Sequence, residues 1–160
     1  MTDATDPLDL PLEAVSARIA SGALSPIEAT EAALERIARL DGALTSFQHV
    51  MADSARAAAA ARAAELARGM SRGPLHGVPI AVKDLCDTHD APTAAGMAIH
   101  RDRRPTEDCT VVARLRAAGA VIVGKLAQTE GAFAGHHPDM PTPVNPWNKD
   151  VWTGVSSSGS

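Results

Sequence analysis

The sequence predicts an α/β fold whose strands pair in parallel. Residues 78–83 form an apolar run with β-branched side chains, which is typical of a buried strand, and Pro79 suits its first position. A helix that ends near Ala118 follows, and Gly119 is its stop signal. Residues 120–123 then form a second apolar run. A strand, a helix and a strand in this order pair their strands in parallel through a right-handed crossover.

The composition excludes several classes of protein. The 160 residues are enough for one domain with a hydrophobic core. The net charge is -4, and no run of lysine or arginine provides the positive charge with which proteins bind nucleic acid or an anionic membrane. Neither is therefore an expected partner. No apolar stretch is as long as a membrane span, and the first residues lack a signal-peptide pattern, so the sequence predicts a cytoplasmic protein. Cys86 and Cys109 have no metal-binding spacing, and we expect half-buried thiols rather than a disulfide framework.

The first elements are predicted to be two helices. Residues 1–10 are polar at their start and are expected to form a disordered or frayed N-terminus, ahead of a helix over residues 11–20. Ser25, Pro26 and Glu28 then give the pattern of a capping box with proline at the first helical position. The expected apolar stripe of this second helix consists of Ile27, Leu34 and Ile37.

The remaining elements follow from local composition. Residues 45–50 predict a short strand, and the alanine-dense residues 52–68 predict a helix by propensity rather than by an apolar face. Residues 88–105 are expected to form a long ordered loop. Asp108 is the expected N-cap of the next helix. Residues 125–160 alternate Gly, Pro, His and Ser, which indicates active-site loops rather than core.

Two segments, the strand that ends at Lys83 and the stretch over residues 154–160, supply an amine and several hydroxyls. Brought together, such groups could activate a nucleophile. Lys83 follows five uncharged residues, which should bury its stem, and a lysine without hydration can lose its proton and act as a base. The alternative is a strand-terminal lysine in solvent. Residues 154–160 form a Gly/Ser-rich stretch that could equally be a flexible linker. Trp147 and Trp152 lie beside it and indicate packing, which favours a structured loop.

Several charged residues near these segments have less specific interpretations. Asp84 could hold the loop after Lys83 by hydrogen bonds or lie exposed. Lys125 and Glu130 are expected to form a solvated ion pair. For His136, His137 and Asp139 a metal site is disfavoured, because adjacent side chains on an extended segment point apart and no third ligand is evident. These last three residues are expected to line or rim the substrate cleft.

Four ordered motifs, residues 73–84, 119–126, 142–147 and 154–160, resemble the amidase signature family. Members of this family hydrolyse carboxylic amides with a Ser-Ser-Lys triad whose middle serine has a cis peptide bond. The resemblance covers most of the chain from Pro11 onward. It implies that residues 11–160 are the N-terminal part of an amidase signature domain, with a mixed β-sheet core covered by helices and incomplete at Ser160.

The resemblance also implies roles for individual residues. Lys83 would be the base and Ser156 the cis serine that relays a proton, although Val155 departs from the family's commoner Gly-Gly pair. Loop or substrate support would come from Ser157, Ser158, Gly159 and Ser160, and one of these serines could carry the relay instead. The attacking serine would lie about twenty residues beyond Ser160, on a glycine-rich turn that forms the oxyanion hole. An attack by Ser160 itself would require a different architecture.

The implied function is hydrolysis of a small-molecule amide to an acid and ammonia or an amine through an acyl-serine intermediate. The resemblance implies neither a metal nor an organic cofactor. One alternative within the family is the amidase subunit of a glutamyl-tRNA(Gln) amidotransferase, which makes ammonia from glutamine for a partner protein. The other is a catalytically inactive truncated fragment, and the isolated chain of 160 residues is expected to be inactive.

Overall fold

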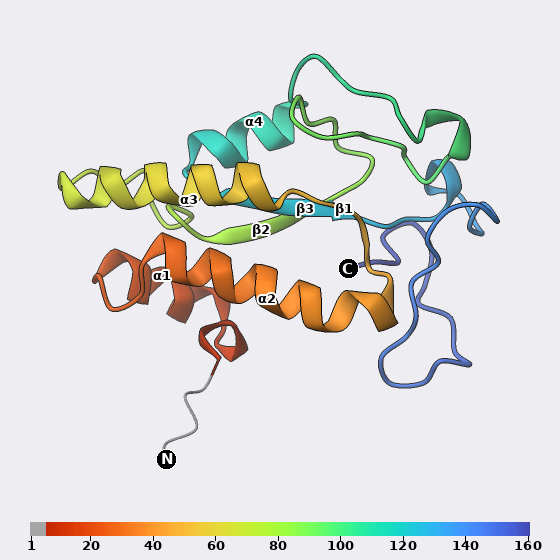
Figure 1. Cartoon of the computed structure of the whole chain (residues 1–160), viewed down its shortest axis with the longest axis horizontal. Helices are drawn as coiled ribbons and strands as arrows, with labels where there is room; N and C mark the ends of the chain where they lie inside the picture. The colour runs from red at the N-terminus through yellow and green to blue at the C-terminus, as the bar shows by residue number, and fades with distance from the viewer. Residues whose placement is uncertain (1–5) are drawn as a thin grey trace.

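The computed structural model describes residues 6–160, and their helices and strands form an α/β fold (Figure 1). The elements in chain order are α1 (Leu12–Ala20), α2 (Pro26–Leu44), β1 (Phe47–Val50), α3 (Ala52–Ala67), β2 (Pro79–Lys83), α4 (Thr110–Ala117) and β3 (Val121–Leu126). Single turns of 3-10 helix occur at Pro7–Asp9, Ala98–His100 and Glu130–Ala132. None of the helices in this described part combines the length and apolarity needed to cross a membrane.

The sheet has mixed strand directions among the described residues. Its order is β1-β3-β2, so β3 is central, antiparallel to β1 and parallel to β2. The parallel pairing predicted for the strand-helix-strand unit is therefore confirmed. The sequence predicted a buried strand for β2, but β2 lies at the sheet edge, and it is only half-buried apart from Val82.

A β-bulge interrupts the pairing of β2 with β3. Ile80 pairs with Ile122, but the next pair is Ala81 with Gly124. Val123 is therefore an extra residue in β3. Because side chains alternate between the two faces of a strand, one extra residue reverses the faces of all residues that follow it.

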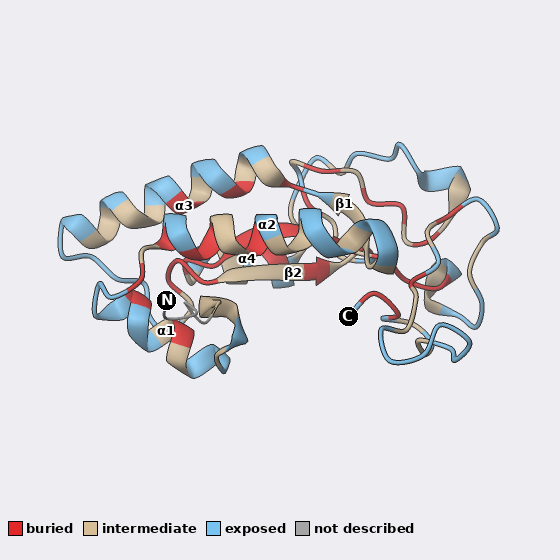
Figure 2. Cartoon of the chain, turned by 60° about the horizontal axis from the view of Figure 1, so that its bottom comes forward, coloured by how far each residue is buried: buried red, intermediate tan, exposed pale blue. Residues whose placement is uncertain are grey.

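Helices cover both faces of the sheet. On one face α1, α2 and α3 pack against β2 and β3, and α4 packs on the other face (Figure 2). The first face holds two clusters of buried side chains, which include Ala33 and Ala55 in one and Ile19 in the other. The cluster on the second face includes Val82 and Val112. The alanine-rich α3 contributes Ala55 and Ala59, small side chains that permit close contact with α2.

The capping box predicted at the start of α2 is confirmed. Ser25 Oγ accepts a hydrogen bond from Glu28 N (3.0 Å), and Glu28 Oε2 accepts one from Ser25 N (2.8 Å). The predicted apolar stripe was wrong at Ile27, which is 44% exposed. Ile27 lies at the flank of the buried face, whose centre is occupied by Thr30 and Ala33.

Asp108 is not the N-cap of α4, contrary to our prediction. Cys109 occupies that position and makes no side-chain capping bond. The Asp108 carboxylate instead accepts a hydrogen bond from His89 N (3.0 Å) and pairs with Arg116 Nε (3.0 Å). Because the Asp108 carboxylate already binds a backbone N–H group and a guanidinium, it is not available to cap the helix.

The N-terminal segment predicted to be frayed contacts α2 from Asp6 onward. Asp6 accepts a hydrogen bond from Leu8 N (2.9 Å), and Arg36 of α2 forms ion pairs with Asp6 and Asp9, each at 2.6 Å. Residues 1–5 of that segment lie outside the described residues.

Candidate active site

The two segments with candidate catalytic groups meet at the carboxyl end of β2. Lys83 is the last residue of this strand, and residues 154–160, which we call the serine loop, fold back to it (Figure 1). Lys83 Nζ donates a hydrogen bond to Ser156 Oγ, and both residues are partly buried. The structure therefore joins the predicted base and the predicted relay serine in one contact.

Buried Thr129 holds the backbone of Ser156. Ser156 N donates to Thr129 Oγ1 (3.0 Å), and Ser156 O accepts from Thr129 N (3.3 Å). Ser157 N donates to Val155 O (3.1 Å), which closes a three-residue turn centred on Ser156. Ser156 has a φ of 73°, a left-handed value that is strained for a residue other than glycine. Sequence analysis did not single out Thr129, and its type gives no signal for this role.

The cis peptide bond that the resemblance implied at the relay serine is not found. No peptide bond among residues 6–160 is cis, so this feature of the prediction was wrong. A cis bond before a residue other than proline costs about 3 kcal/mol relative to trans. Here the loop makes its sharp turn through the left-handed backbone of Ser156 instead.

The rest of the serine loop lies against β3 and the loop that follows it. Gly159 N donates to Ala127 O (3.0 Å), and a Cβ atom at this position would lie 2.8 Å from Ala127 N. Only glycine permits this approach of the two backbones. Ser157 and Ser160 are exposed, and Ser160 N donates to Ser157 O (3.1 Å).

Ser158 is buried beside a histidine. Its Oγ lies 2.8 Å from His136 Nε2, and burial lowers the pKa of His136, which favours the neutral imidazole. His137 lies in the same loop, but its Nδ1 accepts a hydrogen bond from Asp139 N (3.1 Å). Of the two adjacent histidines, His136 is thus the one that contacts the serine loop.

A group of possible metal ligands lies away from the serine loop. The ligand atoms of His89, Asp90 and Asp108 fall within 4.8 Å of one another. Arg116 already pairs with both carboxylates, at 2.7 Å from Asp90 and 3.0 Å from Asp108. A guanidinium in this position supplies the positive charge that a metal ion would otherwise bring, so the group is a structural ion network.

The solvated ion pair predicted for Lys125 and Glu130 was wrong. Lys125 is 0% exposed, and its Nζ lies 2.6 Å from Thr93 Oγ1 and 3.3 Å from Asp84 Oδ1. Asp84 is also 0% exposed, and its Oδ2 accepts a hydrogen bond from Ala94 N (3.0 Å). Burial raises the pKa of Asp84 and lowers the pKa of Lys125, while the attraction between the two charges opposes both shifts.

The sequence held a signal for this buried lysine. Lys125 follows a run of eight uncharged residues, 117–124, the same kind of pattern that singled out Lys83. Glu130, five residues further along, gave the opposite indication of an ion pair in solvent. The carboxylate that pairs with it, Asp84, is far away in the sequence and is brought near by the parallel pairing of β2 and β3.

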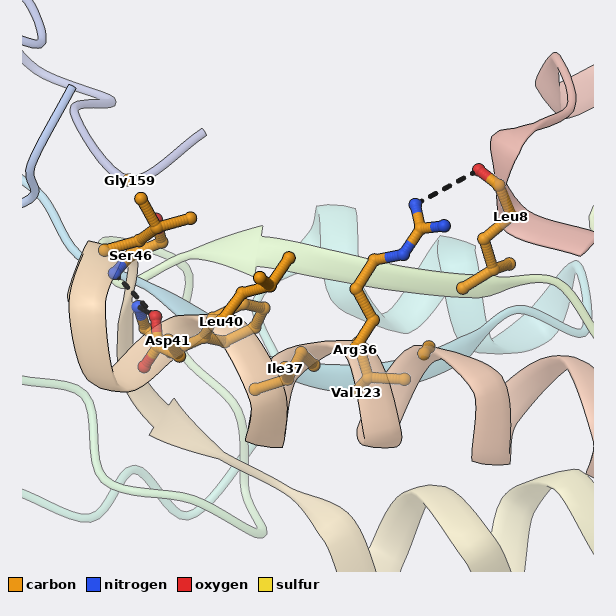
Figure 3. Close-up of a pocket in the computed structure, with 11 residues that line it drawn as sticks. Leu8, Arg36, Ile37, Leu40, Asp41, Ser46, Val123 and Gly159 are labelled. Atoms are coloured by element: carbon orange, nitrogen blue, oxygen red, sulfur yellow. Dashed lines mark hydrogen bonds between the residues drawn. The ribbon is translucent and has the colours of Figure 1, made fainter. Parts of the chain in front are cut away.

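Two cavities border the serine loop. An apolar cavity of about 310 Å³ runs along α2, with Leu8 at one end and Gly159 at the other (Figure 3). A second cavity of about 390 Å³ is lined by residues that include Trp147, Ser158 and Ser160. Trp147 is 94% exposed and Trp152 is 59% exposed, so the packing predicted for the two tryptophans is not provided by the described residues.

Comparisons with known proteins point to one family. The family model described as Amidase matches residues 28–160. A protein named "Putative amidase AmiD" from Mycobacterium tuberculosis (strain ATCC 25618 / H37Rv) is 61% identical over 150 residues, which is 94% of this chain and 32% of that protein. A glutamyl-tRNA(Gln) amidotransferase subunit from Anaeromyxobacter dehalogenans (strain 2CP-C) is 46% identical over 161 residues, which is 99% of this chain and 33% of that protein.

Solved structures agree with this result. The native peptide amidase from Stenotrophomonas maltophilia superimposes with a TM-score of 0.85 at 34% identity, over 99% of this chain and 33% of that chain. A protein from a study of the origins of an s-triazine catabolic enzyme gives a TM-score of 0.89 at 36% identity, over 94% of this chain and 34% of that chain. The chain thus spans about a third of the length of these relatives.

Proposed function

This chain belongs to the amidase signature family, and from that membership we propose that it carries the base and the proton relay of a serine amidase. The whole protein would hydrolyse a small carboxylic amide to an acid and ammonia or an amine. The observation that supports this proposal most directly is the hydrogen bond between Lys83 Nζ and Ser156 Oγ. It joins an amine and a hydroxyl from distant parts of the sequence at the carboxyl end of a parallel strand, which is where α/β folds place their sites.

The proposed proton path runs from an attacking serine through Ser156 to Lys83. Lys83 with a neutral amine accepts the Ser156 hydroxyl proton, while Ser156 accepts the proton of the attacking serine. The attacking oxygen then bonds to the amide carbon, the carbon–nitrogen bond breaks, and the same path returns the proton to the departing nitrogen. Water then gives up a proton along this path and attacks the acyl-serine ester, which releases the acid and restores the serine hydroxyl. We infer from the family resemblance that the attacking serine lies beyond residue 160. These steps use only side chains, the substrate and water, so the proposal calls for neither a metal nor an organic cofactor.

Lys83→Ala and Ser156→Ala test this proposal in the protein expressed from its complete gene. Each variant should lower ammonia release from simple aliphatic or aryl amides by about a thousandfold or more, because members of a catalytic triad act as a unit. Lys149→Ala is the matched control, since Lys149 is an exposed lysine of the C-terminal loops and should keep full activity. Amide hydrolysis by Lys83→Ala at the unaltered rate would rule out the proposed base.

A second candidate is the amidase subunit of a tRNA-dependent amidotransferase. The 46% identity to a protein of that name supports it, whereas the 61% identity to AmiD favours the first candidate. The two differ in partner and in substrate. An amidotransferase subunit should copurify with a second protein and release ammonia from glutamine, and a stand-alone amidase should act on simple amides without a partner.

We also propose that the reaction takes place in the cytoplasm. Cys86 and Cys109 are free thiols that pack against the same buried cluster. Two cysteines that pack against the same cluster and yet form no disulfide are typical of a reducing compartment, in which disulfides are rare.

A further inference from the structure

The β-bulge in β3 determines where the side chain of Lys125 points. Val123 packs on the face covered by α2 and α3, and without the bulge Lys125 would point to that face as well. Because the bulge inserts one residue, Lys125 instead pairs with Val82, whose side chain packs with Val112 of α4 on the opposite face. Bulges near active sites commonly redirect a side chain in this way.

On that face Lys125 joins three separate segments. Its Nζ lies 3.3 Å from Asp84 Oδ1 at the end of β2, and it donates to Thr93 Oγ1 (2.6 Å) and Pro92 O (3.3 Å). Asp84 Oδ2 extends the cluster by accepting a hydrogen bond from Ala94 N (3.0 Å). The carboxyl ends of β2 and β3 and the loop at residues 92–94 are therefore fixed to one another.

Lys83 lies between the residues that this cluster fixes. It precedes Asp84 and pairs with Leu126, and Asp84 N donates to Leu126 O (3.0 Å), which continues the ladder past Lys83. Since side chains alternate along a strand, Lys83 points away from the face that holds Asp84 and Lys125. Its backbone is thus held from one face while its amine reaches Ser156 on the other.

Stability alone does not explain two fully buried charges. Removing a carboxylate and an ammonium from water is costly, and apolar residues of similar volume commonly serve the fold equally well or better. The pair does, however, fix the backbone on both sides of Lys83.

We propose that Lys125 and Asp84 are positioning residues that hold Lys83 in line with Ser156. This inference rests on the proposed function, because it assigns the pair to the geometry of the proposed base. Neither residue touches the reacting atoms. Each acts through the backbone of β2 and β3.

The variant Asp84→Asn/Lys125→Met tests the proposal. It removes both charges, so no unpaired charge remains buried, and asparagine can still accept the hydrogen bond from Ala94 N. In the protein expressed from its complete gene, kcat should fall about tenfold or more while KM changes less than about threefold, because the loss lies in orientation rather than in binding. A folded double variant with unchanged kcat would overturn the proposal.

An exposed ion pair on the same segment provides the matched control. Arg103 binds Asp87 with two hydrogen bonds of 2.7 and 2.8 Å, and both side chains are partly exposed. Asp87→Asn/Arg103→Met makes the same kind of charge change outside the cluster, so it should leave kcat unaltered. Thr93→Val removes a hydroxyl partner of Lys125 without any charge change, and it should lower kcat in the same direction if the double variant fails to fold.

A labelling experiment tests the positioning separately from amidase activity. Trace acetylation with acetic anhydride, followed by mass spectrometry of the peptide that contains Lys83, measures how reactive this amine is. Asp84→Asn/Lys125→Met should change the labelling rate of Lys83 by about threefold or more, because the amine loses its fixed contact with Ser156. Unchanged labelling would refute the positioning role. A wild-type protein that hydrolyses no amide would refute the proposed function and leave the labelling result to decide the positioning.

Discussion

Ser156 combines a strained backbone with the hydroxyl that contacts Lys83. Its φ of 73° lies in the left-handed region, which costs a residue with a side chain about 1 kcal/mol or more. Two hydrogen bonds to Thr129 hold it there. The fold thus maintains an unfavourable conformation at the point where the amine and the hydroxyl meet.

This strain predicts different stabilities for two variants that both lack the hydroxyl. Ser156→Gly should be more stable than Ser156→Ala by about 1 kcal/mol, because glycine adopts a positive φ without strain. Neither variant should hydrolyse amides, since both lose the proposed relay. Urea unfolding of the two purified proteins measures the difference. Equal stabilities would argue against the left-handed conformation, and hydrolysis by Ser156→Gly would argue against the relay.

The two lysines at the strand ends show which features of the site a sequence pattern can predict. Lys83 and Lys125 both follow uncharged runs, and in each case such a run indicates a buried stem. For Lys83 the pattern and the family motifs together led to the serine loop, which the structure brings into contact with it. The burial of Lys125 depends on the bulge at Val123, whose position is set by pairing between distant segments and leaves no local mark in the sequence.

At the level of elements, features encoded within a few residues were predictable and those set by distant partners were not. The capping box of Ser25 and Glu28 is a local pattern, and it was found at the predicted position. The parallel pairing followed from element order alone. Asp108 failed as a cap because its carboxylate is engaged by His89 and Arg116, and the latter partner lies at the far end of α4.

The capping box leads to a prediction about α2. Ser25→Ala removes the hydroxyl that accepts from Glu28 N, so it should lower the free energy of unfolding by about 1 kcal/mol. Ser54→Ala is the control, because the Ser54 hydroxyl only donates to Met51 O in the preceding turn. Urea unfolding measures both changes. An equal effect of the two substitutions would show that the cap contributes nothing specific.

The pH dependence of this cap has a defined sign. The hydrogen bond from Ser25 N lowers the pKa of Glu28 below its usual 4.5. A carboxyl group whose pKa is lower in the folded state stabilises the fold at pH values above its unfolded pKa, and that contribution is lost as the pH falls through the folded value. The stability difference between the wild type and Glu28→Gln should therefore be present at neutral pH and disappear well below pH 4.5.

At the scale of the whole molecule, the described residues leave aromatic side chains and an apolar cavity uncovered. Phe133 is 80% exposed and Trp147 is 94% exposed, and the apolar cavity along α2 opens next to Gly159 (Figure 3). Exposed apolar groups that gather into a patch commonly mark a binding surface. The chain also spans only about a third of the length of the relatives it matches.

We therefore predict that residues 1–160, expressed alone, bind a hydrophobic dye strongly and hydrolyse no amide. The dye should bind because aromatic residues and an apolar cavity are exposed. The chain should be inactive because the attacking serine is proposed to lie beyond residue 160. Dye fluorescence and ammonia release measure the two properties, with the protein expressed from the complete gene as the reference. If the isolated chain released ammonia and lost this activity on Ser156→Ala, the attacking hydroxyl would have to lie within these residues. Ser160, which is exposed at the end of the same loop, would then be the first serine to replace.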